Sequence, residues 1–413
     1  MMSLKPPLER VVAESENPEQ RSLSSPSILR LPSGKLLVSF DEFSTDRTPP
    51  QVGRTLVSVS EDDGASWRIA ASFPIVQARL FADDRCVYLF GHRGDLCISR
   101  SEDGEKWSDP VPLTSGQHWH QSATNVWHTN DGVYLVSERR IAHCGDTWVV
   151  PWLAPVLLKG RRNEDLTDRR NWSFATELVF AEAVPGVKQN QTIGDYFGVP
   201  FFSQQYPVRA HVGGGRFMHP LGWLEGNVTQ ILDERHVWHD PSKRTFHLLL
   251  RCNTGGVGLG ALAKVVEGTD GSLTTLLESV PSGRKCLFVP LPGGHLRFYL
   301  LYDAHDRLYW LIGNQSTDSM CRIECVPPER YNLPNNERNR LVIHFSRNLV
   351  DWCFGGTIHS SKDERITRCY PSGVIDGEDL LVVARGADAR SPSPRESNLI
   401  TFYRVKDFRR LAY

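Results

Sequence analysis

The stretch that decides the fold is Ser60-Glu61-Asp62-Asp63-Gly64-Ala65-Ser66-Trp67. It follows a short apolar run, Arg54-Thr55-Leu56-Val57-Ser58-Val59, which is typical of a β-strand. In such a stretch an Asp side chain accepts hydrogen bonds from nearby backbone amides, a Gly takes a positive φ, and a Trp folds back over the hairpin. The stretch therefore predicts a tight turn between two antiparallel strands.

The same pattern recurs along the chain. A copy that is one residue shorter reads Ser101-Glu102-Asp103-Gly104-Glu105-Lys106-Trp107, and a diverged copy reads Ser346-Arg347-Asn348-Leu349-Val350-Asp351-Trp352. A fourth, more distant relative runs from Asp165 to Trp172. Recurrence of one turn, each time after a strand pattern, predicts a small sheet unit that is repeated around one architecture.

These turns resemble the Asp-boxes of the sialidase superfamily, which join the outer strands of propeller blades away from the active site. The chain is similar to the bacterial proteins described as sialidase-like or exo-α-sialidase-like. The similarity extends over most of the sequence, in segments 25–28, 164–172, 222–227, 302–310, 376–379 and 398–404. It implies an all-β fold, a six-bladed β-propeller of four-stranded antiparallel blades.

The strand and turn signals divide the chain into six such units within a single domain spanning residues 1–413. The expected blades cover residues 24–72, 76–113, 118–172, 222–265, 286–355 and 366–405. A strand at residues 8–13 is expected to complete the last blade. The loop at 181–218 is long and rich in aromatic residues, and we expect it to be functional, because long loops in compact domains usually are.

Composition excludes several classes of function. The chain of 413 residues has 47 Lys and Arg against 48 Asp and Glu, so its charge gives no support to a nucleic-acid or membrane partner. No apolar run is long enough for a membrane helix and no signal-peptide pattern is visible, which favours a cytoplasmic location. The nine cysteines show no ligand spacing, so we expect reduced thiols and no zinc site. No cofactor motif is present, and no cofactor is expected.

Polar residues at the ends of inner strands are the candidate site, because those ends converge on the central funnel of a propeller. The candidates for catalysis are Asp41, His120, Glu225 and Tyr370, with Glu138 in reserve. The candidates for substrate binding are Arg93, Tyr206, Arg209, Asn227, Arg251, Arg368, Arg385 and Asn398.

Each candidate also has a structural interpretation. Asp41 is equally well a solvated strand end, and Arg93 is better explained as part of a turn. A buried Arg251 needs an anion, which is either a substrate carboxylate or an internal acid. Tyr206 and Tyr370 are as well suited to be aromatic walls for a sugar as to be catalysts.

Three functions follow as hypotheses, all with an oligosaccharide or polysaccharide partner. The first is a glycoside hydrolase acting on an acidic or deoxy sugar, with Asp41 and Glu225 as its carboxyl pair. The second is a polysaccharide lyase similar to ulvan lyases, using His120 and a tyrosine for proton transfer and Arg209 or Arg251 to neutralise a uronate. The third is a non-catalytic glycan-binding propeller. The sialidase resemblance implies three arginines for a carboxylate and a Tyr–Glu nucleophile pair, but the place of the first arginine reads Ser24-Ser25-Pro26.

Overall fold

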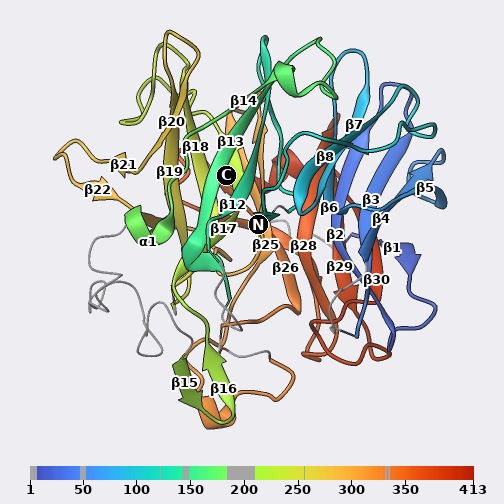
Figure 1. The fold of residues 1–413 in the computed structure, drawn as a ribbon. Helices are drawn as coiled ribbons and strands as arrows, with labels where there is room; N and C mark the ends of the chain where they lie inside the picture. Colours follow the sequence, from blue (N-terminus) through green and yellow to red (C-terminus); the bar gives the residue numbers. More distant parts are fainter. Residues whose placement is uncertain are drawn as a thin grey trace.

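The computed structural model describes residues 7–46, 53–120, 122–142, 148–183, 210–254, 256–330, 333 and 335–413. The predicted all-β fold is confirmed: six antiparallel sheets form the blades of a β-propeller (Figure 1). Tyr206 and Arg209, with most of the long loop predicted at 181–218, lie outside the described residues. None of the described helices combines the length and the apolar character needed to cross a bilayer.

Blades 1 to 3 follow one another along the chain. Blade 1 contains β2 (Arg21–Arg30), β3 (Leu36–Ser44), β4 (Gly53–Ser60) and β5 (Arg68–Phe73). Blade 2 contains β6 (Val76–Ala82), β7 (Val87–Arg93), β8 (Asp95–Ser101) and β9 (Val111–Pro112). Blade 3 contains β10 (Trp119–His120) and β11 (Trp127–His128), which both pair with β12 (Gly132–Arg140), and then β13 (Leu153–Arg161) and β14 (Trp172–Phe174).

Blades 4 to 6 complete the ring. Blade 4 contains β17 (Gly222–Thr229), β18 (Thr245–Asn253), β19 (Leu259–Glu267) and β20 (Leu273–Leu276), and β23 (Phe288–Pro290) adds to β19. Blade 5 contains β24 (Tyr299–Asp303), β25 (Leu308–Asn314), β26 (Arg340–Ser346) and β27 (Cys353–Ser360). Blade 6 contains β28 (Thr367–Asp376), β29 (Asp379–Ala387), β30 (Leu399–Val405) and β1 (Glu9–Glu14), the last of which lies beside β30 at the right of Figure 1.

Short elements decorate the blades. They are the hairpins β15 (Ala210–Gly213) with β16 (Arg216–Met218) and β21 (Glu278–Ser279) with β22 (Lys285–Cys286), the helix α1 (Phe180–Ala183), and the 3₁₀ turns Val150–Trp152, Arg169–Asn171, Ile323–Cys325 and Phe408–Leu411. Residues 286–290, expected in blade 5, instead extend blade 4, because β23 pairs with β19. Hydrophobic clusters fill the spaces between neighbouring blades, with Trp223 and Trp310 fully buried.

The repeated turns all connect the third and fourth strands of a blade. In blade 1 the Asp62 carboxylate accepts from the Ser66 amide at 2.8 Å, and Gly64 donates to the Ser60 hydroxyl at 2.8 Å. Asp103 and Asn348 make the corresponding bonds in blades 2 and 5. The turn from Asp165 to Trp172 takes the same place in blade 3. These local bonds fix the hairpins independently of the rest of the fold.

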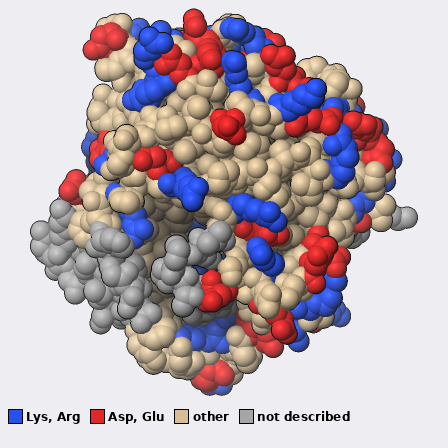
Figure 2. Space-filling model, turned by 45° about the vertical axis from the view of Figure 1, so that its right-hand side comes forward, with Lys and Arg blue, Asp and Glu red and all other residues tan. Residues whose placement is uncertain are grey.

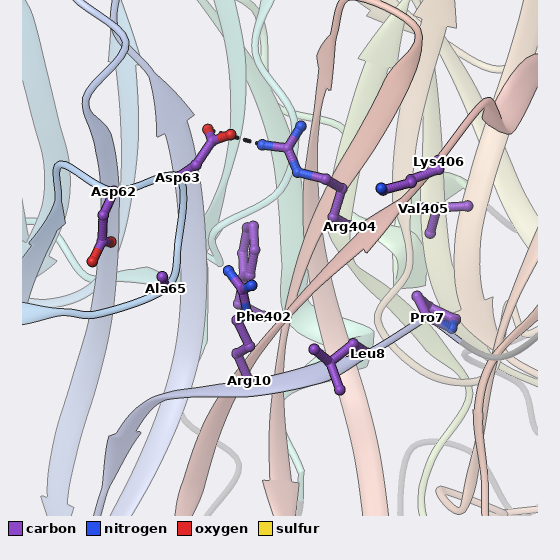
Figure 3. A pocket seen from close by; sticks show the side chains of 10 residues that line it. All are labelled: Pro7, Leu8, Arg10, Asp62, Asp63, Ala65, Phe402, Arg404, Val405 and Lys406. Atoms are coloured by element: carbon purple, nitrogen blue, oxygen red, sulfur yellow. Dashed lines mark ion pairs between the residues drawn. The ribbon is translucent and has the colours of Figure 1, made fainter.

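Each turn also packs on the preceding blade. Gly64 lies so close to Phe402 of blade 6 that a Cβ would come within 2.6 Å of its ring, and Gly104 faces Leu37 of blade 1. Beside the first contact, at the junction of blades 1 and 6, a cavity of about 520 Å³ lies between Asp63, Arg10 and Arg404 (Figure 3). The Asp63–Arg404 ion pair at 2.9 Å crosses that junction. Positive and negative side chains are intermixed on the face shown in Figure 2.

The contact at Gly104 gives a stability prediction. Gly104→Ala should lower the free energy of unfolding by about 1–2 kcal/mol, because Ala disfavours the left-handed conformation at φ 77°. The clash with Leu37, to which a Cβ would approach within 2.7 Å, should remove about 1–3 kcal/mol more. Gly94→Ala is the matched control, because Gly94 has φ 81° and open space around it. It should therefore lose only the stability that the left-handed conformation costs. Chemical denaturation of the two variants measures the difference, and equal losses would contradict the packing argument.

Candidate active site

The inner strands are joined to one another around the ring by polar side chains. Four hydroxyl or amide oxygens accept a backbone N–H from the next blade: Ser27 from Leu80, Asn125 from Val228, Asn227 from Leu300 and Ser372 from Ile28. The two remaining junctions are closed by Arg79, which donates to Val136, and by Arg297, which donates to the carbonyls of Tyr370 and Pro371. Asn227, predicted to bind substrate, is therefore fully buried and engaged in holding blade 4 to blade 5.

Arg297 also reaches across the centre of the ring. It lies just before β24 of blade 5 and donates to the Ser122 hydroxyl of blade 3, the Pro26 carbonyl of blade 1 and the Tyr370 carbonyl of blade 6. Burial lowers the pKa of Arg297 to about 10, so the guanidinium stays charged at neutral pH. Arg297 is only 1 % exposed, and it places a positive charge beneath the funnel.

Four inner strands carry the same irregularity where they enter the funnel. A β-bulge in β2, β6, β17 and β28 shifts the pairing register, and one residue in each bulge has a positive φ of 49–55°. These residues are Ser25, Gln77, Glu225 and Tyr370. Bulges re-aim side chains, and positive φ in residues other than Gly or Asn is a strain that concentrates at functional sites. The bulges bring Gln77, Glu225 and Tyr370 from three blades to one cavity.

This central cavity has a volume of about 460 Å³. At its base one nitrogen of Arg251, Nη1, donates to the Glu225 carboxylate and to the Tyr370 hydroxyl, at 3.0 Å in both cases. Arg251 Nε donates to the His295 carbonyl at 2.9 Å. Five of the predicted site residues line this cavity: His120, Glu225, Arg251, Tyr370 and Arg385.

Four guanidinium groups surround the ring of Tyr370. Their central carbons lie 3.9 Å from the ring centroid for Arg385, 5.5 Å for Arg297 and Arg338, and 5.7 Å for Arg251. Burial works to raise the pKa of the Tyr370 phenol, but the charges of Arg251, Arg338 and Arg385 outweigh it and lower the pKa below its usual value. Arg251 and Arg297 likewise lower the pKa of Glu225 against the effect of burial. The cavity is therefore built to hold negative charge.

His120 lines the other side of the cavity. Its Nδ1 lies 3.0 Å from a carboxylate oxygen of Glu138, whose second oxygen accepts the Gly226 amide at 3.0 Å. Burial opposes the charged imidazole, but the bond to Glu138 and its charge raise the pKa of His120. Glu138 thereby couples His120 to the bulge that presents Glu225.

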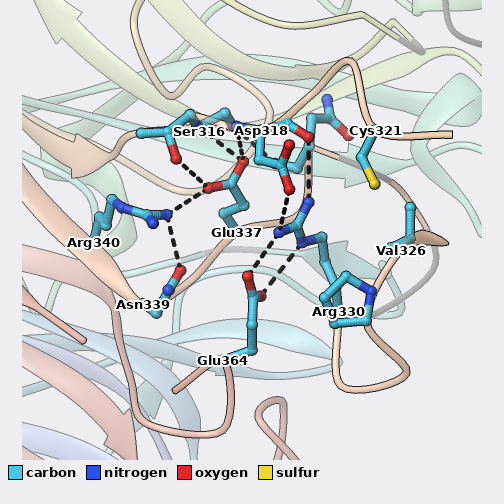
Figure 4. A network of polar contacts seen from close by, with 12 residues as sticks. Ser316, Asp318, Cys321, Val326, Arg330, Glu337, Asn339, Arg340 and Glu364 are labelled. Atoms are coloured by element: carbon cyan, nitrogen blue, oxygen red, sulfur yellow. Dashed lines mark hydrogen bonds and ion pairs between the residues drawn. The ribbon is translucent and has the colours of Figure 1, made fainter. Parts of the chain in front are cut away.

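Arg338, on the segment between β25 and β26, was not among the sequence candidates. Glu337, fully buried, accepts from the Thr317 and Asp318 amides at 2.9 and 2.8 Å and pairs with Arg340 at 2.6 Å (Figure 4). Nearby, Arg330 pairs with Glu364 at 2.7 Å. This network fixes the segment between β25 and β26, from which Asn335, Asn336 and Arg338 line the cavity.

Three predicted substrate contacts lie elsewhere. Arg368 forms a forked ion pair with Glu9 of β1, at 2.6 and 2.9 Å, and also donates to two carbonyls, so its guanidinium is occupied in blade 6. Asn398 is fully buried and bonded to Asp388. Arg93 is exposed at the β7–β8 turn. All three residues lie at or next to strand ends, as the sequence predicted, but their side chains do not line the central cavity.

Asp41 requires a correction too, because its side chain is completely buried and does not line the central cavity. Its carboxylate accepts from the Thr55 hydroxyl at 2.7 Å and from the Gln77 amide at 2.8 and 2.9 Å. Asp41 thus supports the bulge at Gln77, and the carboxyl pair expected from Asp41 and Glu225 is not assembled in the cavity.

This buried carboxyl predicts a pH effect. Burial raises the pKa of Asp41 from its usual value of 3.8 to about 7, although the bonds from Thr55 and Gln77 oppose the shift. Between those two pH values the native state binds more protons than the unfolded state. The contribution of Asp41 to stability therefore falls as the pH rises from about 4 to about 7, and stays constant above pH 7. Denaturation at a series of pH values should show Asp41→Asn gaining on the wild type from about pH 4 to pH 7.

Asp103→Asn serves as the control, since turn amides lower the pKa of Asp103 to about 2 and it stays ionised throughout that range. A difference in stability between wild type and Asp41→Asn that does not change with pH would contradict the raised pKa of Asp41.

Among the described residues no three His, Cys, Asp or Glu side chains gather as metal ligands. The eight described cysteines are free thiols.

Comparison with known proteins places the fold. No protein-family model matches the sequence, and no curated protein matches it. Among solved structures, a Dyadobacter fermentans protein of unknown function aligns over 98 % of this chain and 100 % of its own, with 12 % identity and a TM-score of 0.56. Trypanosoma rangeli sialidase in complex with the inhibitor DANA aligns over 98 % of this chain and 61 % of its own, with 13 % identity and a TM-score of 0.55.

An α-L-arabinanase of Penicillium chrysogenum aligns over 97 % of this chain and 99 % of its own, with 12 % identity and a TM-score of 0.50. The chain spans about three fifths of the length of the sialidase chain but nearly all of the other two. At such identities the likeness establishes a shared fold, the sialidase-like six-bladed propeller, and function has to be argued from the site itself.

Proposed function

We propose that this protein is a glycoside hydrolase acting on an acidic sugar bound in the central cavity, and that its turns are the Asp-boxes of a sialidase-superfamily propeller. The observation that carries the proposal is the single Arg251 nitrogen shared between the Glu225 carboxylate and the Tyr370 hydroxyl. A phenol with a lowered pKa at the base of a cavity is suited to be a nucleophile.

The surrounding arginines support an acidic substrate. Arg338 and Arg385 flank Tyr370, and both line the central cavity. A guanidinium binds a carboxylate through two parallel hydrogen bonds, and charge-assisted bonds of this kind are stronger than neutral ones. A uronate or sialate carboxylate placed over Tyr370 would compensate the excess of positive charge.

The residues then divide the reaction between them. The Tyr370 oxygen attacks the anomeric carbon, its proton passing to Glu225, while the leaving-group oxygen takes a proton from His120. Water then attacks the anomeric carbon and gives its proton to His120, while the bond to the Tyr370 oxygen breaks. That oxygen takes its proton back from Glu225, which restores both side chains and completes hydrolysis. A Tyr nucleophile is known among glycosidases as an alternative to the usual carboxyl pair, and it removes the need for Asp41 in the cavity.

β-Elimination is the second candidate, and one observation favours it. Among the described residues that line the central cavity, Glu225 is the only carboxylate. A lyase needs no carboxyl pair: arginines neutralise the uronate carboxylate, a Tyr removes the proton beside it, and a His or Tyr protonates the leaving oxygen. His120 and Tyr370 both line the cavity.

A panel of uronate- and sialate-containing oligosaccharides distinguishes the candidates. We expect new reducing ends without the ultraviolet absorbance of an unsaturated uronate, and loss of the signal in Glu225→Gln. Absorbance that rises together with the reducing ends would replace hydrolysis by elimination. Binding without either signal would establish a non-catalytic glycan-binding propeller.

A further inference from the structure

A second, smaller cavity opens beside the central one, at the junction of blades 1 and 6. This side cavity has a volume of about 190 Å³, and its walls include Ser24 and Phe43 of blade 1 together with Arg385, Arg395 and Ser397 of blade 6. Arg385 and Arg395 line the central cavity as well. The two cavities are therefore contiguous, with these two arginines between them.

Arg385 is placed to serve both cavities. On one side its guanidinium stacks on the Tyr370 ring at 3.9 Å, and on the other its Nη1 donates to the Ser24 hydroxyl at 2.8 Å. Its Nε is buried and has no hydrogen-bond partner among the described residues. A guanidinium has five N–H donors, so donors remain for a ligand.

Ser397 provides an independent observation. Its side chain is 1 % exposed, and its hydroxyl finds no hydrogen-bond partner within the described part of the chain. Leaving a buried polar group unsatisfied costs about 1–3 kcal/mol, so such a group in the wall of a cavity needs an explanation. A ligand hydroxyl in the side cavity would satisfy it.

We propose that the side cavity is a subsite for a second sugar unit, so that the substrate is an acidic oligosaccharide that spans Arg385. The inference rests on the proposed function, because it places the acidic unit over Tyr370. Phe43 offers an apolar wall and Ser24, Arg385 and Ser397 offer polar groups, which is the mixture that a sugar ring with its hydroxyls requires. Glu396 also lines the side cavity and can accept a sugar hydroxyl.

Isothermal titration calorimetry with the intact chain tests this. The ligands are galacturonic acid against digalacturonate, and N-acetylneuraminic acid against sialyllactose, and each recovered ligand is checked for turnover. For at least one pair, we expect the longer ligand to bind at least about 10-fold more tightly than the single sugar. Ser397→Ala should remove about 3- to 10-fold of that gain, which is the worth of one hydrogen bond, and leave the affinity for the single sugar unchanged.

Stability separates this role from a structural one. Ser397→Ala removes no hydrogen bond of the described free protein, so its free energy of unfolding should not fall. Ser58→Ala is the matched control, since Ser58 is also buried without a partner among the described residues but lies away from both cavities. Equal affinity for long and short ligands, or an undiminished gain in Ser397→Ala, would overturn the subsite. Tight binding of the longer ligand without turnover would overturn the proposed reaction and leave the subsite standing, whereas no binding of any sugar would overturn both.

Discussion

Tyr370→Phe is expected to lower kcat on the acidic substrate by at least about 100-fold, because the variant lacks the proposed nucleophile, while leaving the fold intact. The substitution removes one oxygen and keeps the ring on which Arg385 stacks. It also keeps the Tyr370 carbonyl that accepts from Arg297. The strained bulge is therefore undisturbed, and the loss should fall on kcat more than on KM, because the missing oxygen acts in the transition state.

The control for this prediction is Tyr309→Phe. The Tyr309 hydroxyl donates to the Gln230 carbonyl at 2.9 Å, and neither residue lines the central cavity. Loss of this hydroxyl should therefore cost about 1 kcal/mol of stability and no activity. Steady-state kinetics and thermal unfolding of both variants are the measurements. If Tyr370→Phe keeps more than a tenth of the wild-type kcat, the phenol is a wall for the sugar, and the reaction has to be reassigned to His120 and Glu225.

The turns and blades could be predicted from sequence because their chemistry is local. A Ser, an Asp or Asn and a residue of positive φ lie within a few positions, and the bonds that they form are to their own backbone. Leu349 shows the tolerance of the motif: it takes φ 64° where the copies in blades 1 and 2 have Gly. The boundary of blade 5 was misplaced because a strand pattern does not identify the strand with which it pairs.

The candidate site was predictable only in part. Glu225, Arg251 and Tyr370 were selected as polar residues at expected strand ends, although they lie within β17, β18 and β28. The same rule also selected Asp41, Asn227 and Arg368, which are buried and do not line the central cavity. The bulge is what sets Glu225 and Tyr370 apart, and its sequence signal is weak: Ser25 and Tyr370 precede Pro, whereas Gln77 precedes Ala and Glu225 precedes Gly. Arg297 and Arg338 were missed because their roles depend on contacts between blades, which no local pattern encodes.

Arg251→Met should be the most destabilising substitution in the cavity, at about 3–5 kcal/mol, because it leaves the Glu225 carboxylate buried without its partner. Glu225 is 7 % exposed and Arg251 is 9 % exposed, so water replaces little of the lost interaction. Activity should be lost as well, since Arg251 positions the Tyr370 oxygen. Arg170→Met is the control, because the Arg170–Asp168 pair lies on the surface, where water screens it, so its loss should leave stability almost unchanged.

The double variant Arg251→Met with Glu225→Gln decides whether the charge or the packing of this pair matters. If the cost of Arg251→Met is that of an unpaired carboxylate, neutralising Glu225 should restore stability, so that the double variant unfolds at higher denaturant than Arg251→Met alone. Activity should not return, because Arg251, which positions the Tyr370 oxygen, and Glu225, which accepts its proton, are both gone. An inactive double variant that is at least as stable as the wild type would show that the pair is maintained for chemistry, since its charges then contribute no more to stability than neutral side chains do. A double variant no more stable than Arg251→Met would instead assign the loss to the bonds of Arg251 with Tyr370 and the His295 carbonyl.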